Sequence, residues 1–431
     1  MGPAPNFDAP GDVTISRTAR ARQSQPPRPG PTLYTEEIVA PDIPAIQRAL
    51  RDAGLEAWLL YDFHGANPVA VRVAGLDGSG HLATRRWYYL IPAEGAPKAL
   101  VHAIERHNLD HLPGEKQLYA GREELEAGLT DLLRGVRQVA MEYSPGCAIP
   151  YVSRLDAGTA EAIRARGVEI VSSGDLVQQF EAVWAPAQVA SHRAASEALY
   201  RIKDRAFDAA FTAVREGRRL DEFDLQQQMW TWFEEEGLDS DSPPVVAVGP
   251  NASSPHYLPT RASALPITAD VLLLLDLWGK RKEPHAVFAD ITWVGYTGRQ
   301  LPARMSEVFA VVAGARDAAV SLVQERARAG QQVQGFEADR AARQVLVDAG
   351  FGAYVAHRTG HNLGESVHGN GAHLDDYETH DERQLLPGTG FTVEPGLYLG
   401  DFGIRSEINV YRDFRDAVVT GARQEVIVSL V

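Results

Sequence analysis

The sequence predicts an α/β domain followed by an α+β domain. Between residues 32 and 185, short apolar runs alternate with helical patterns, which is typical of an α/β sheet. The pattern breaks at WAPAQ (184–188), and beyond it long amphipathic helices are interleaved with apolar strands and followed by them. At 431 residues the chain is long enough for two cores. We therefore expect a flexible Pro-, Gly- and Arg-containing arm at 1–31, a first domain at 32–185 and a second domain at 186–431.

The first domain is expected to alternate helices with short apolar strands. Ile46, Leu50 and Leu55 share one face of a helix, and the next run, EAWLLYD, is strand-like. No Gly-rich phosphate fingerprint and no cluster of reactive side chains occurs here, so the apolar spacing indicates a core rather than a cofactor site. The expected strands are 56–62, 87–92, 99–104, 138–143 and 168–173, and the expected helices are 43–55, 122–133 and 155–166.

The second domain is expected to begin with a long helix after Pro186. Leu199, Ile202 and Phe207 belong to its apolar face, and Asp221 is a suitable N-cap for the next helix. No repeat with a period of 20–50 residues is visible, which argues against a solenoid. Two further helices are expected at 303–329 and 336–349, and strands at 271–276, 286–294, 390–399, 406–411 and 424–431.

Composition indicates an ordinary soluble globular protein. The apolar fraction is 45%, and 42 basic against 57 acidic residues give a net charge of −15, which argues against nucleic acid or an anionic membrane as partner. Cys147 is the only cysteine, so an intrachain disulfide framework and a thiolate metal site are excluded. No apolar run approaches the ~18 residues of a membrane span, and the N-terminus lacks a secretory apolar region. We expect a cytoplasmic location.

Five metal-type side chains stand in distinctive short settings in the last part of the chain. One histidine and four carboxylates form a hard, mostly oxygen ligand set, which suits two divalent ions of the manganese, cobalt or zinc kind. Two such ions held close together can activate a water and polarise a carbonyl, so we expect a dinuclear metallohydrolase. The residues are Asp276 (LLLLDLWG), Asp290 (FADITWVG), His361 (HRTGHNLG), Glu394 (FTVEPGLY) and Glu407 (IRSEINVY).

The two aspartates fall at the end of one apolar run and inside another. A carboxylate there is costly unless a cation or hydrogen bonds compensate it. For Asp276 the alternative is a residue that ends a strand and turns into a loop. For Asp290 that alternative is weaker, because it lies within VFADITWV. A hairpin joining the two strands would place both carboxylates side by side, and a metal would relieve their repulsion.

The other candidates lie in irregular or glycine-rich surroundings. His361 stands beside glycines with His357 and His368 close by in sequence, although a lone histidine is more often a satisfied structural one. Glu394 precedes Pro395, which cannot donate a strand hydrogen bond, so this stretch is expected to be irregular and to face a ligand. Arg405 lies two residues before Glu407, where a cation suits a substrate carboxylate or a developing oxyanion. The alternative is a salt bridge to one of the acids.

The order Asp, Asp, His, Glu, Glu resembles the pita-bread metallopeptidases, which include methionine aminopeptidase, aminopeptidase P and prolidase. The resemblance covers roughly 190–431 and, more loosely, the N-terminal domain, which looks creatinase-like. Three features resemble the proline-specific branch: His256 in PNASSPHYLP, the seven-residue step from His361 to His368, and Arg405 before Glu407. The resemblance implies a creatinase-like α/β domain followed by a pita-bread α+β catalytic domain, and a homodimer.

The resemblance also implies a role for each side chain. Asp276 would chelate one ion, Asp290 and Glu407 would bridge both, and His361 would complete the other. Glu394 would be both a ligand and the general base that takes a proton from the attacking water. The catalytic set would be Glu394, His256, His368 and Arg405, of which the two histidines hold the substrate and stabilise the oxyanion.

Three departures from the family pattern indicate a divergent subgroup with a more open site. Asp276 and Asp290 are fourteen residues apart, about three more than is usual in the branch. Trp293 follows DIT where arginine is common, and Pro244 occupies a place where many relatives carry a tyrosine near the metals. None of these departures removes a ligand.

The resemblance favours an Xaa-Pro dipeptidase (prolidase) with two divalent ions, most simply manganese, acting on peptides with proline in second position. An aminopeptidase P that accepts longer peptides is the alternative, because motifs do not separate the two. A non-catalytic binding protein of the same fold and a metal-free amidinohydrolase are disfavoured, since all five ligands are present. The motifs G-x-S-x-G and H-E-x-x-H are absent, so a serine hydrolase and a zincin have no support.

Overall fold

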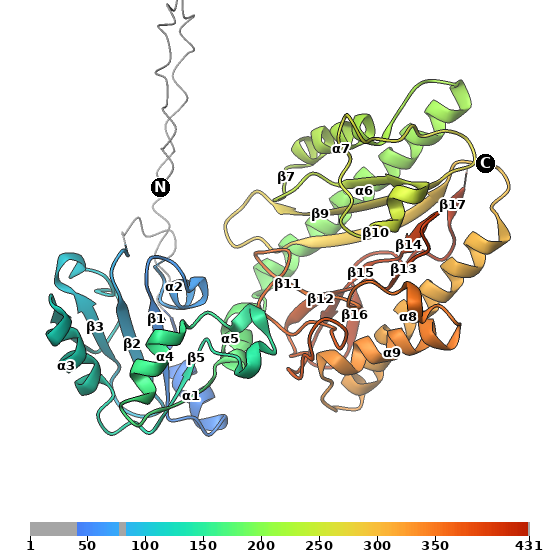
Figure 1. The fold of residues 1–431 in the computed structure, drawn as a ribbon. Helices are drawn as coiled ribbons and strands as arrows, with labels where there is room; N and C mark the ends of the chain where they lie inside the picture. Colours follow the sequence, from blue (N-terminus) through green and yellow to red (C-terminus); the bar gives the residue numbers. More distant parts are fainter. Residues whose placement is uncertain (1–40, 77–82, 430–431) are drawn as a thin grey trace, which may run out of the picture. The chain divides into compact units, whose positions relative to one another are not determined.

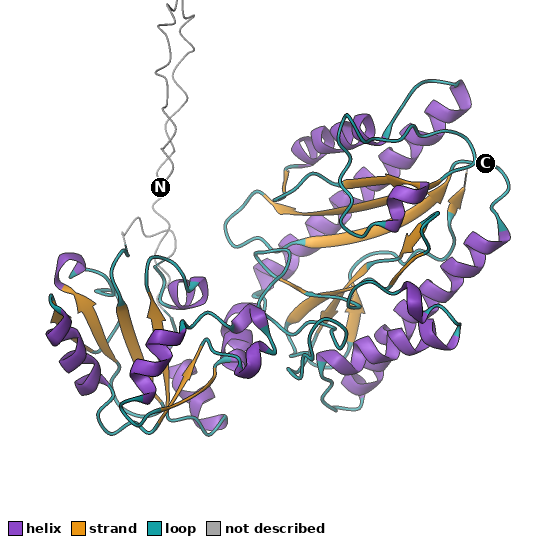
Figure 2. Cartoon of the chain, in the orientation of Figure 1, coloured by secondary structure: helices purple, strands orange, loops and turns teal. Residues whose placement is uncertain are grey.

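The structure, a computed structural model, describes residues 41–76 and 83–429 (Figure 1). The arm expected at 1–31 lies outside the described residues, and the expected domain boundaries stay a prediction. Figure 2 shows helices packed against one sheet in the first part of the chain and against a second group of strands in the rest of the chain. No helix among the described residues is long and apolar enough to cross a membrane.

The first part of the chain forms a six-stranded mixed sheet. Its strand order is β4-β3-β2-β1-β5-β6, in which the β1–β2 and β2–β3 pairs are antiparallel and the others are parallel. The strands are β1 (Ala57–Asp62), β2 (Trp87–Pro92), β3 (Lys98–His102), β4 (Glu115–Tyr119), β5 (Gln138–Met141) and β6 (Glu169–Ser172). All five predicted strands are confirmed, and β4 was not predicted because its sequence, EKQLY, is mostly polar and exposed.

Helices cover both faces of this sheet, which explains the continuous apolar runs of its central strands. In β1, Trp58 and Leu60 belong to one core, while Leu59 and Tyr61 belong to a second core on the opposite face. The helices are α1 (Ile43–Asp52), α2 (Pro68–Val73), α3 (Arg122–Leu132), α4 (Ala157–Arg164) and α5 (Gly174–Val177). The predicted helices are thus confirmed, with ends that differ by a few residues.

The second part contains a five-stranded and a four-stranded sheet with helices on their outer sides, and a separate two-stranded sheet (Figure 1). Helix α6 packs on β9 and β10, and α8 packs on α9 and on strands of the other sheet. The helices are α6 (Pro186–Glu216), α7 (Glu222–Glu236), α8 (Ala303–Arg328) and α9 (Gly335–Asp348). The first sheet contains β7 (Leu238–Asp239), β8 (Val245–Val248), β9 (Leu272–Arg281), β10 (Ala289–Tyr296) and β17 (Val428–Ser429). The second contains β11 (Asn362–Leu363), β12 (Thr389–Val393), β15 (Ile408–Arg412) and β16 (Ala417–Val419), and β13 (Gly396–Tyr398) pairs with β14 (Gly403–Arg405).

The helices of the second part agree with the sequence prediction. Asp221 is the N-cap of α7, and its carboxylate accepts a hydrogen bond of 2.8 Å from the main-chain N–H of Asp224. The α/β domain followed by an α+β domain is therefore confirmed. Single-turn helices join the elements: they are η1 (Ala103–Glu105), η2 (Pro145–Cys147), η3 (Pro150–Val152), η4 (Gln178–Ala182), η5 (Gly249–Ser253) and η6 (Gly352–Tyr354).

Three predicted strands differ most from the observed ones in their bounds. Asp276 was expected to end its strand, but β9 continues to Arg281, so this carboxylate lies inside the strand. The strand expected at 390–399 is two strands, β12 and β13, which are interrupted at Glu394 and Pro395 because Pro395 cannot donate to a ladder. The strand expected at 424–431 is reduced, within the described residues, to β17.

The alternation along β9 decides which way Asp276 points. Leu273 and Leu275 pack with α6 in one core, whereas Leu272 and Leu274 belong to the core that also contains residues of α8. Since side chains alternate across a strand, Asp276 shares the face of Leu272 and Leu274, away from α6. The carboxylate therefore faces the region between the two sheets.

Candidate metal centre

The pairing of β9 with β10 brings the two aspartates together. In this antiparallel ladder Asp276 is opposite Thr292, and Asp290 is opposite Trp278. The two carboxylates are thus diagonal neighbours on one face of the sheet, within reach of a shared ligand. Both residues are buried, at 8% and 5% exposure. The predicted hairpin that sets the carboxylates side by side is confirmed.

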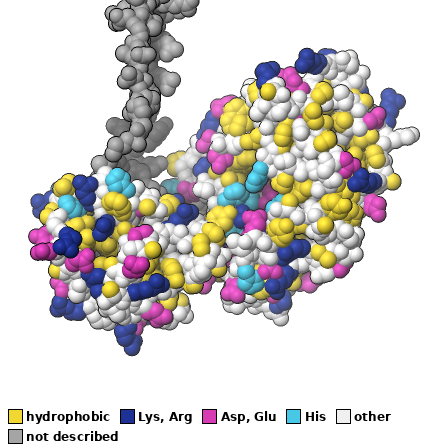
Figure 3. Space-filling view, viewed as in Figure 1, with side chains coloured by type: hydrophobic (Ala, Val, Ile, Leu, Met, Phe, Trp, Pro, Cys, Tyr) yellow, Lys and Arg dark blue, Asp and Glu magenta, His cyan; other side chains and the backbone are white. Residues whose placement is uncertain are grey.

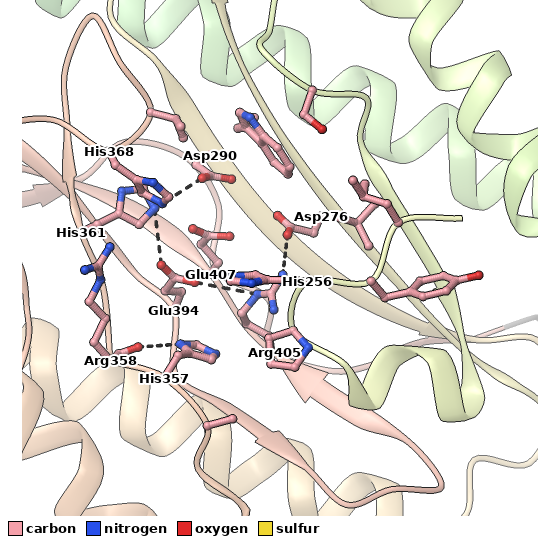
Figure 4. Close-up of a pocket in the computed structure, with 18 of the residues that line it drawn as sticks. His256, Asp276, Asp290, His357, Arg358, His361, His368, Glu394, Arg405 and Glu407 are labelled. Atoms are coloured by element: carbon pink, nitrogen blue, oxygen red, sulfur yellow. Dashed lines mark hydrogen bonds and ion pairs between the residues drawn. The ribbon is translucent and has the colours of Figure 1, made fainter. Parts of the chain in front are cut away.

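The second sheet supplies the other three candidates. His361 precedes β11, Glu394 follows β12 and Glu407 precedes β15. His361 Nε2 lies 3.6 Å from Asp290 Oδ2 and 3.4 Å from Glu394 Oε1. One ligand atom from each of Asp290, His361 and Glu407 lies within 4.8 Å of the others. All five predicted ligands line one cavity of about 960 Å³, and Figure 4 shows their side chains gathered close to one another.

The atoms of this cluster fit divalent cations. Ligand atoms about 2.1 Å from one ion are separated by roughly 3–4 Å, which matches the distances around His361 Nε2. His361 Nδ1 lies 3.2 Å from the Asn362 carbonyl, which can only accept, so the proton belongs on Nδ1 and Nε2 keeps its lone pair. Among the described residues, the buried Oδ1 of Asp290 has no hydrogen-bond partner. A cation would supply this oxygen with a partner.

Electrostatics supports the same conclusion. Burial, followed by the charge of Glu407, raises the pKa of Asp290 well above its ordinary value. Burial, followed by the charge of Glu394, likewise raises the pKa of Glu407. Burial lowers the pKa of His361 to about 3, so this imidazole is neutral and able to bind a metal. A set of buried, mutually repelling carboxylates beside a neutral histidine is stabilised by positive ions.

Hydrogen bonds hold the candidate ligands in position. The Thr292 hydroxyl donates to Glu407 Oε2 at 2.7 Å, across the two sheets. The main-chain N–H of Asp290 donates to Asn409 Oδ1 at 2.9 Å, and that of His361 donates to the Thr392 hydroxyl at 3.0 Å. Supporting partners of this kind fix the orientation of metal-binding side chains.

Arg405 is paired with the cluster itself. Its Nη2 donates to Asp276 Oδ2, its Nε donates to the Thr292 hydroxyl at 2.9 Å, and its Nη1 donates to the Tyr398 hydroxyl at 2.9 Å. The side chain is only 5% exposed. Each guanidinium nitrogen thus already has a protein partner. The geometry is that of the salt bridge considered as the alternative for this residue.

The remaining predicted residues, His256 and His368, line the same cavity. The ring of His368 stands edge-on to that of His361, with centroids 4.3 Å apart, and burial lowers the pKa of His368 to about 4. His256 is exposed on the loop after η5. In the space-filling view, histidine and acidic side chains gather at a hollow of the surface (Figure 3).

The sequence prediction did not assign roles to His357 and Tyr398. The Tyr398 hydroxyl accepts from Arg405 and lies 2.6 Å from His357 Nε2, while His357 Nδ1 lies 2.6 Å from the Arg358 carbonyl. Because that carbonyl can only accept, His357 Nδ1 donates and Nε2 accepts from Tyr398. Burial lowers the pKa of His357 to about 4 and raises the pKa of Tyr398 to about 12, so both are neutral. In the sequence, the only signal for either residue was its position inside a ligand motif: HRTGHNLG contains His357, and FTVEPGLY contains Tyr398.

Two departures noted in the sequence lie at different distances from the cluster. Trp293 is on the opposite face of β10, where the ammonium of Lys203 lies 3.8 Å from the centre of its indole ring. This substitution therefore does not alter the metal face. Pro244 directly precedes β8, whose Val245 is opposite Asp276 and lines the cavity. The expectation of a more open site then rests on Pro244 and on the longer spacing between Asp276 and Asp290, and it stays a prediction.

Several curated relatives of this chain are named Xaa-Pro dipeptidase. The chain is 30% identical over 202 residues to the Xaa-Pro dipeptidase of Lactobacillus helveticus, which is 47% of this chain and 49% of that protein. It is 26% identical over 210 residues to the Xaa-Pro dipeptidase of Pyrococcus furiosus, which is 48% of this chain and 54% of that protein. The match thus spans about half the length of these relatives.

Solved structures match over most of the chain. Dipeptidase PepE from Mycobacterium ulcerans has a TM-score of 0.68 at 21% identity, covering 90% of this chain and 96% of that one. An X-Pro aminopeptidase from Thermotoga maritima MSB8 has a TM-score of 0.57 at 20% identity, covering 90% and 99%. These likenesses confirm the predicted fold, an α/β N-terminal domain followed by a pita-bread domain.

The family assignment comes from the sequence. The profile of metallopeptidase family M24 matches residues 194–412, which is more than half of the 431 residues and includes all five predicted ligands. The buried Asp290, His361 and Glu407 form a candidate site for the divalent metals that this family uses. The chain belongs to metallopeptidase family M24.

Proposed function

We propose that this protein is an Xaa-Pro dipeptidase that uses two divalent ions, most simply manganese. The observation that supports the proposal most directly is a set of four carboxylates and one neutral histidine that line a single cavity, and all of them except Glu394 are buried. Relatives named Xaa-Pro dipeptidase, at 26–30% identity, support the choice of substrate. An aminopeptidase P is the second candidate, supported by the likeness to an X-Pro aminopeptidase structure.

The proposal assigns a role to each ligand. Asp276, Asp290, His361, Glu394 and Glu407 would hold the ions, with Asp290 and Glu407 shared between them. When bound, the ions would activate a water and polarise the substrate carbonyl. Glu394 would take the proton from that water: its Oε1 accepts from the Thr392 hydroxyl at 3.2 Å, and 15% of its side chain is exposed towards the cavity.

Recognition of the imide bond would depend on shape and on donors. The bond before proline has no N–H, so no main-chain acceptor can recognise it there. His256 and His368 line the cavity and can donate to the carbonyl oxygen as negative charge develops on it. In this arrangement Arg405 would hold Asp276 and Glu394 in position rather than contact the substrate. Its Nη2 donates to Asp276 Oδ2, and its Nε lies 3.9 Å from Glu394 Oε2.

The test uses the purified full chain with manganese and three substrates: an Xaa-Pro dipeptide, an Xaa-Pro tripeptide and the matching Xaa-Ala dipeptide. We expect cleavage of the Xaa-Pro dipeptide in preference to the other two, and loss of activity on chelation. Faster cleavage of the tripeptide would make the protein an aminopeptidase P. Cleavage of Xaa-Ala as fast as Xaa-Pro, or activity that survives chelation with no metal left, would contradict the proposal. Homodimerisation and a cytoplasmic location stay predictions.

A further inference from the structure

A bulge, residues 240–244, lies at the edge of strand β9 that faces away from β10. Strand β7 pairs with β9 there, with Asp239 opposite Lys280. Strand β8 pairs with β9 further along, with Val245 opposite Asp276. The five residues between these two pairs therefore run alongside only three residues of β9. Surplus residues bend a strand away from its ladder and re-aim its side chains, and such bulges are frequent beside active sites.

The main chain of the bulge is held in place. Gln226 Nε2 donates to the Pro244 carbonyl at 2.8 Å, and the Ser240 hydroxyl donates to the Ser242 carbonyl at 3.0 Å. Pro243 and Pro244 have a fixed φ and no N–H, so neither can donate to the ladder. Pro244, one of the departures from the family pattern, thus belongs to this bulge. A side chain on such a segment has a defined direction before any ligand binds.

Trp278 sets the direction of one acid in the bulge. Trp278 is opposite Asp290 in the β9–β10 ladder, so its side chain lies beside that carboxylate on the same face of the sheet. Its indole Nε1–H donates to Asp241 Oδ1 at 2.7 Å. Both Trp278 and Asp241 line the cavity, and Asp241 is exposed. Among the described residues, Asp241 has no other hydrogen bond or ion pair, so its Oδ2 is open to a ligand.

This open carboxylate favours a cation in the cavity. The two arginines that line the cavity are Arg358 and Arg405, and their nearest acids are Asp375 and Asp276 rather than Asp241. The net charge of −15 also draws cations towards the protein. The indole beside the carboxylate offers an apolar surface for the methylene stem of a lysine or arginine side chain, whose charged end would remain near water.

We propose that Asp241 binds the cationic side chain of the substrate residue before proline, so that the enzyme prefers peptides that begin with lysine or arginine. The inference rests on the proposed Xaa-Pro peptidase function and specifies its substrate class. The carbonyl to be cleaved must lie at the ligand cluster, and the side chain of the same residue begins close to that carbonyl. Trp278 leads from Asp290, at the cluster, to Asp241 at its Nε1. A long side chain that follows the indole therefore ends at the Asp241 carboxylate.

The experiment compares Lys-Pro with norleucine-Pro, which has the same straight stem without the ammonium, and with Glu-Pro. Each first residue is tested in the dipeptide and in the matching tripeptide, so that the comparison holds for both candidate functions. Wild type is expected to prefer lysine. Asp241→Asn keeps an oxygen for the Trp278 indole, and it is expected to lower the lysine-to-norleucine ratio of kcat/KM by about 3- to 10-fold, the scale of a partly exposed ion pair. Asp241→Lys is expected to shift the preference towards Glu-Pro.

Asp239→Asn is the matched control, because Asp239 is an exposed acid two residues away, on β7 and outside the lining of the cavity. It removes the same charge and should leave the ratio unchanged. Salt gives a second readout that separates charge from shape. Raising the salt from about 0.05 M to about 0.5 M should lower the ratio of wild type, because salt screens an exposed ion pair, and should barely change that of Asp241→Asn.

The outcomes separate this inference from the proposed function. A wild-type ratio near one would overturn the role of Asp241. Equal losses on lysine and norleucine substrates in Asp241→Asn would overturn it too, because they would mean that the carboxylate serves the α-ammonium common to both. Failure of the metal-loaded wild type to cleave any of these dipeptides and tripeptides would instead overturn the proposed function.

Discussion

Replacing Glu222 by glutamine is expected to destabilise the protein and loosen the loop that carries His256. Glu222 is the first residue of α7 and is fully buried. Its carboxylate accepts from the main-chain N–H groups of Val248 and Leu265, at 2.6 and 2.7 Å, and from Asn251 Nδ2 and the Tyr257 hydroxyl, at 3.0 and 2.6 Å. One side chain thus fastens both ends of the segment 248–265.

The expected magnitude follows from these four donors. Glutamine keeps one acceptor oxygen but places an NH₂ donor where the other oxygen was. The Tyr257 hydroxyl can turn and accept from it, whereas a main-chain N–H cannot. One buried N–H left without a partner costs about 1–3 kcal/mol, and the remaining bonds lose their ionic character. We therefore expect a loss of roughly 2–4 kcal/mol in the free energy of unfolding.

The assay is urea unfolding of the metal-free protein, followed by circular dichroism. With a slope of about 2 kcal/mol per molar urea, the midpoint should fall by roughly 1–2 M. Glu235→Gln is the control, because Glu235 pairs with Arg205 at 2.9 Å on the surface and such pairs contribute about 1 kcal/mol or less. In the metal-loaded enzyme, the KM of the Glu222 variant should rise as the His256 loop loosens. Equal urea midpoints for the two variants would refute the reasoning.

The fold was predictable where burial on both faces leaves a simple pattern. The strands β1 and β2 are continuous apolar runs because helices cover both sides of their sheet. The strand β4 is polar and exposed, so no pattern marks it. The sequence predicted that strand β9 ends at Asp276, because a charge inside an apolar strand is costly on its own. Its compensation comes from Arg405, 129 residues further along the chain, and local sequence does not report such a partner.

The candidate site shows the same division between local and non-local information. Short motifs pointed to all five carboxylate and histidine candidates, and the cavity contains every one of them. The role of Arg405 could not be decided in this way, because its motif fits both a substrate-binding cation and a salt bridge. In the structure, Arg405 donates to Asp276, which comes from a strand 129 residues earlier in the chain. The choice between a structural cation and a substrate-binding one depends on partners that only the fold brings near.

Three further predictions concern the metals, the base and a buried histidine. Glu407→Ala should lose both metal and activity, because its carboxylate belongs to the buried cluster; full occupancy by elemental analysis with normal turnover would exclude it as a ligand. Glu394→Gln should retain most of the metal while turnover falls by ~10²-fold or more, the usual scale for losing general-base help, and turnover near wild type would leave Glu394 without that role. His192 is far along the chain from the candidate ligands, and burial lowers its pKa from 6.5 to about 4. The unfolded chain therefore binds this proton at a higher pH than the folded one, so the stabilisation present above pH 6.5 is lost as the pH falls towards 4. Between pH 7.5 and pH 5 the loss is on the order of 2 kcal/mol. His192→Gln removes the titrating group but leaves every other one in place, so urea midpoints of the metal-free variant should depend less on pH than those of wild type. Parallel pH profiles for the two proteins would show that His192 is not buried as a neutral imidazole between the Phe288 carbonyl and the Thr420 hydroxyl, 2.8 and 2.6 Å from its ring nitrogens.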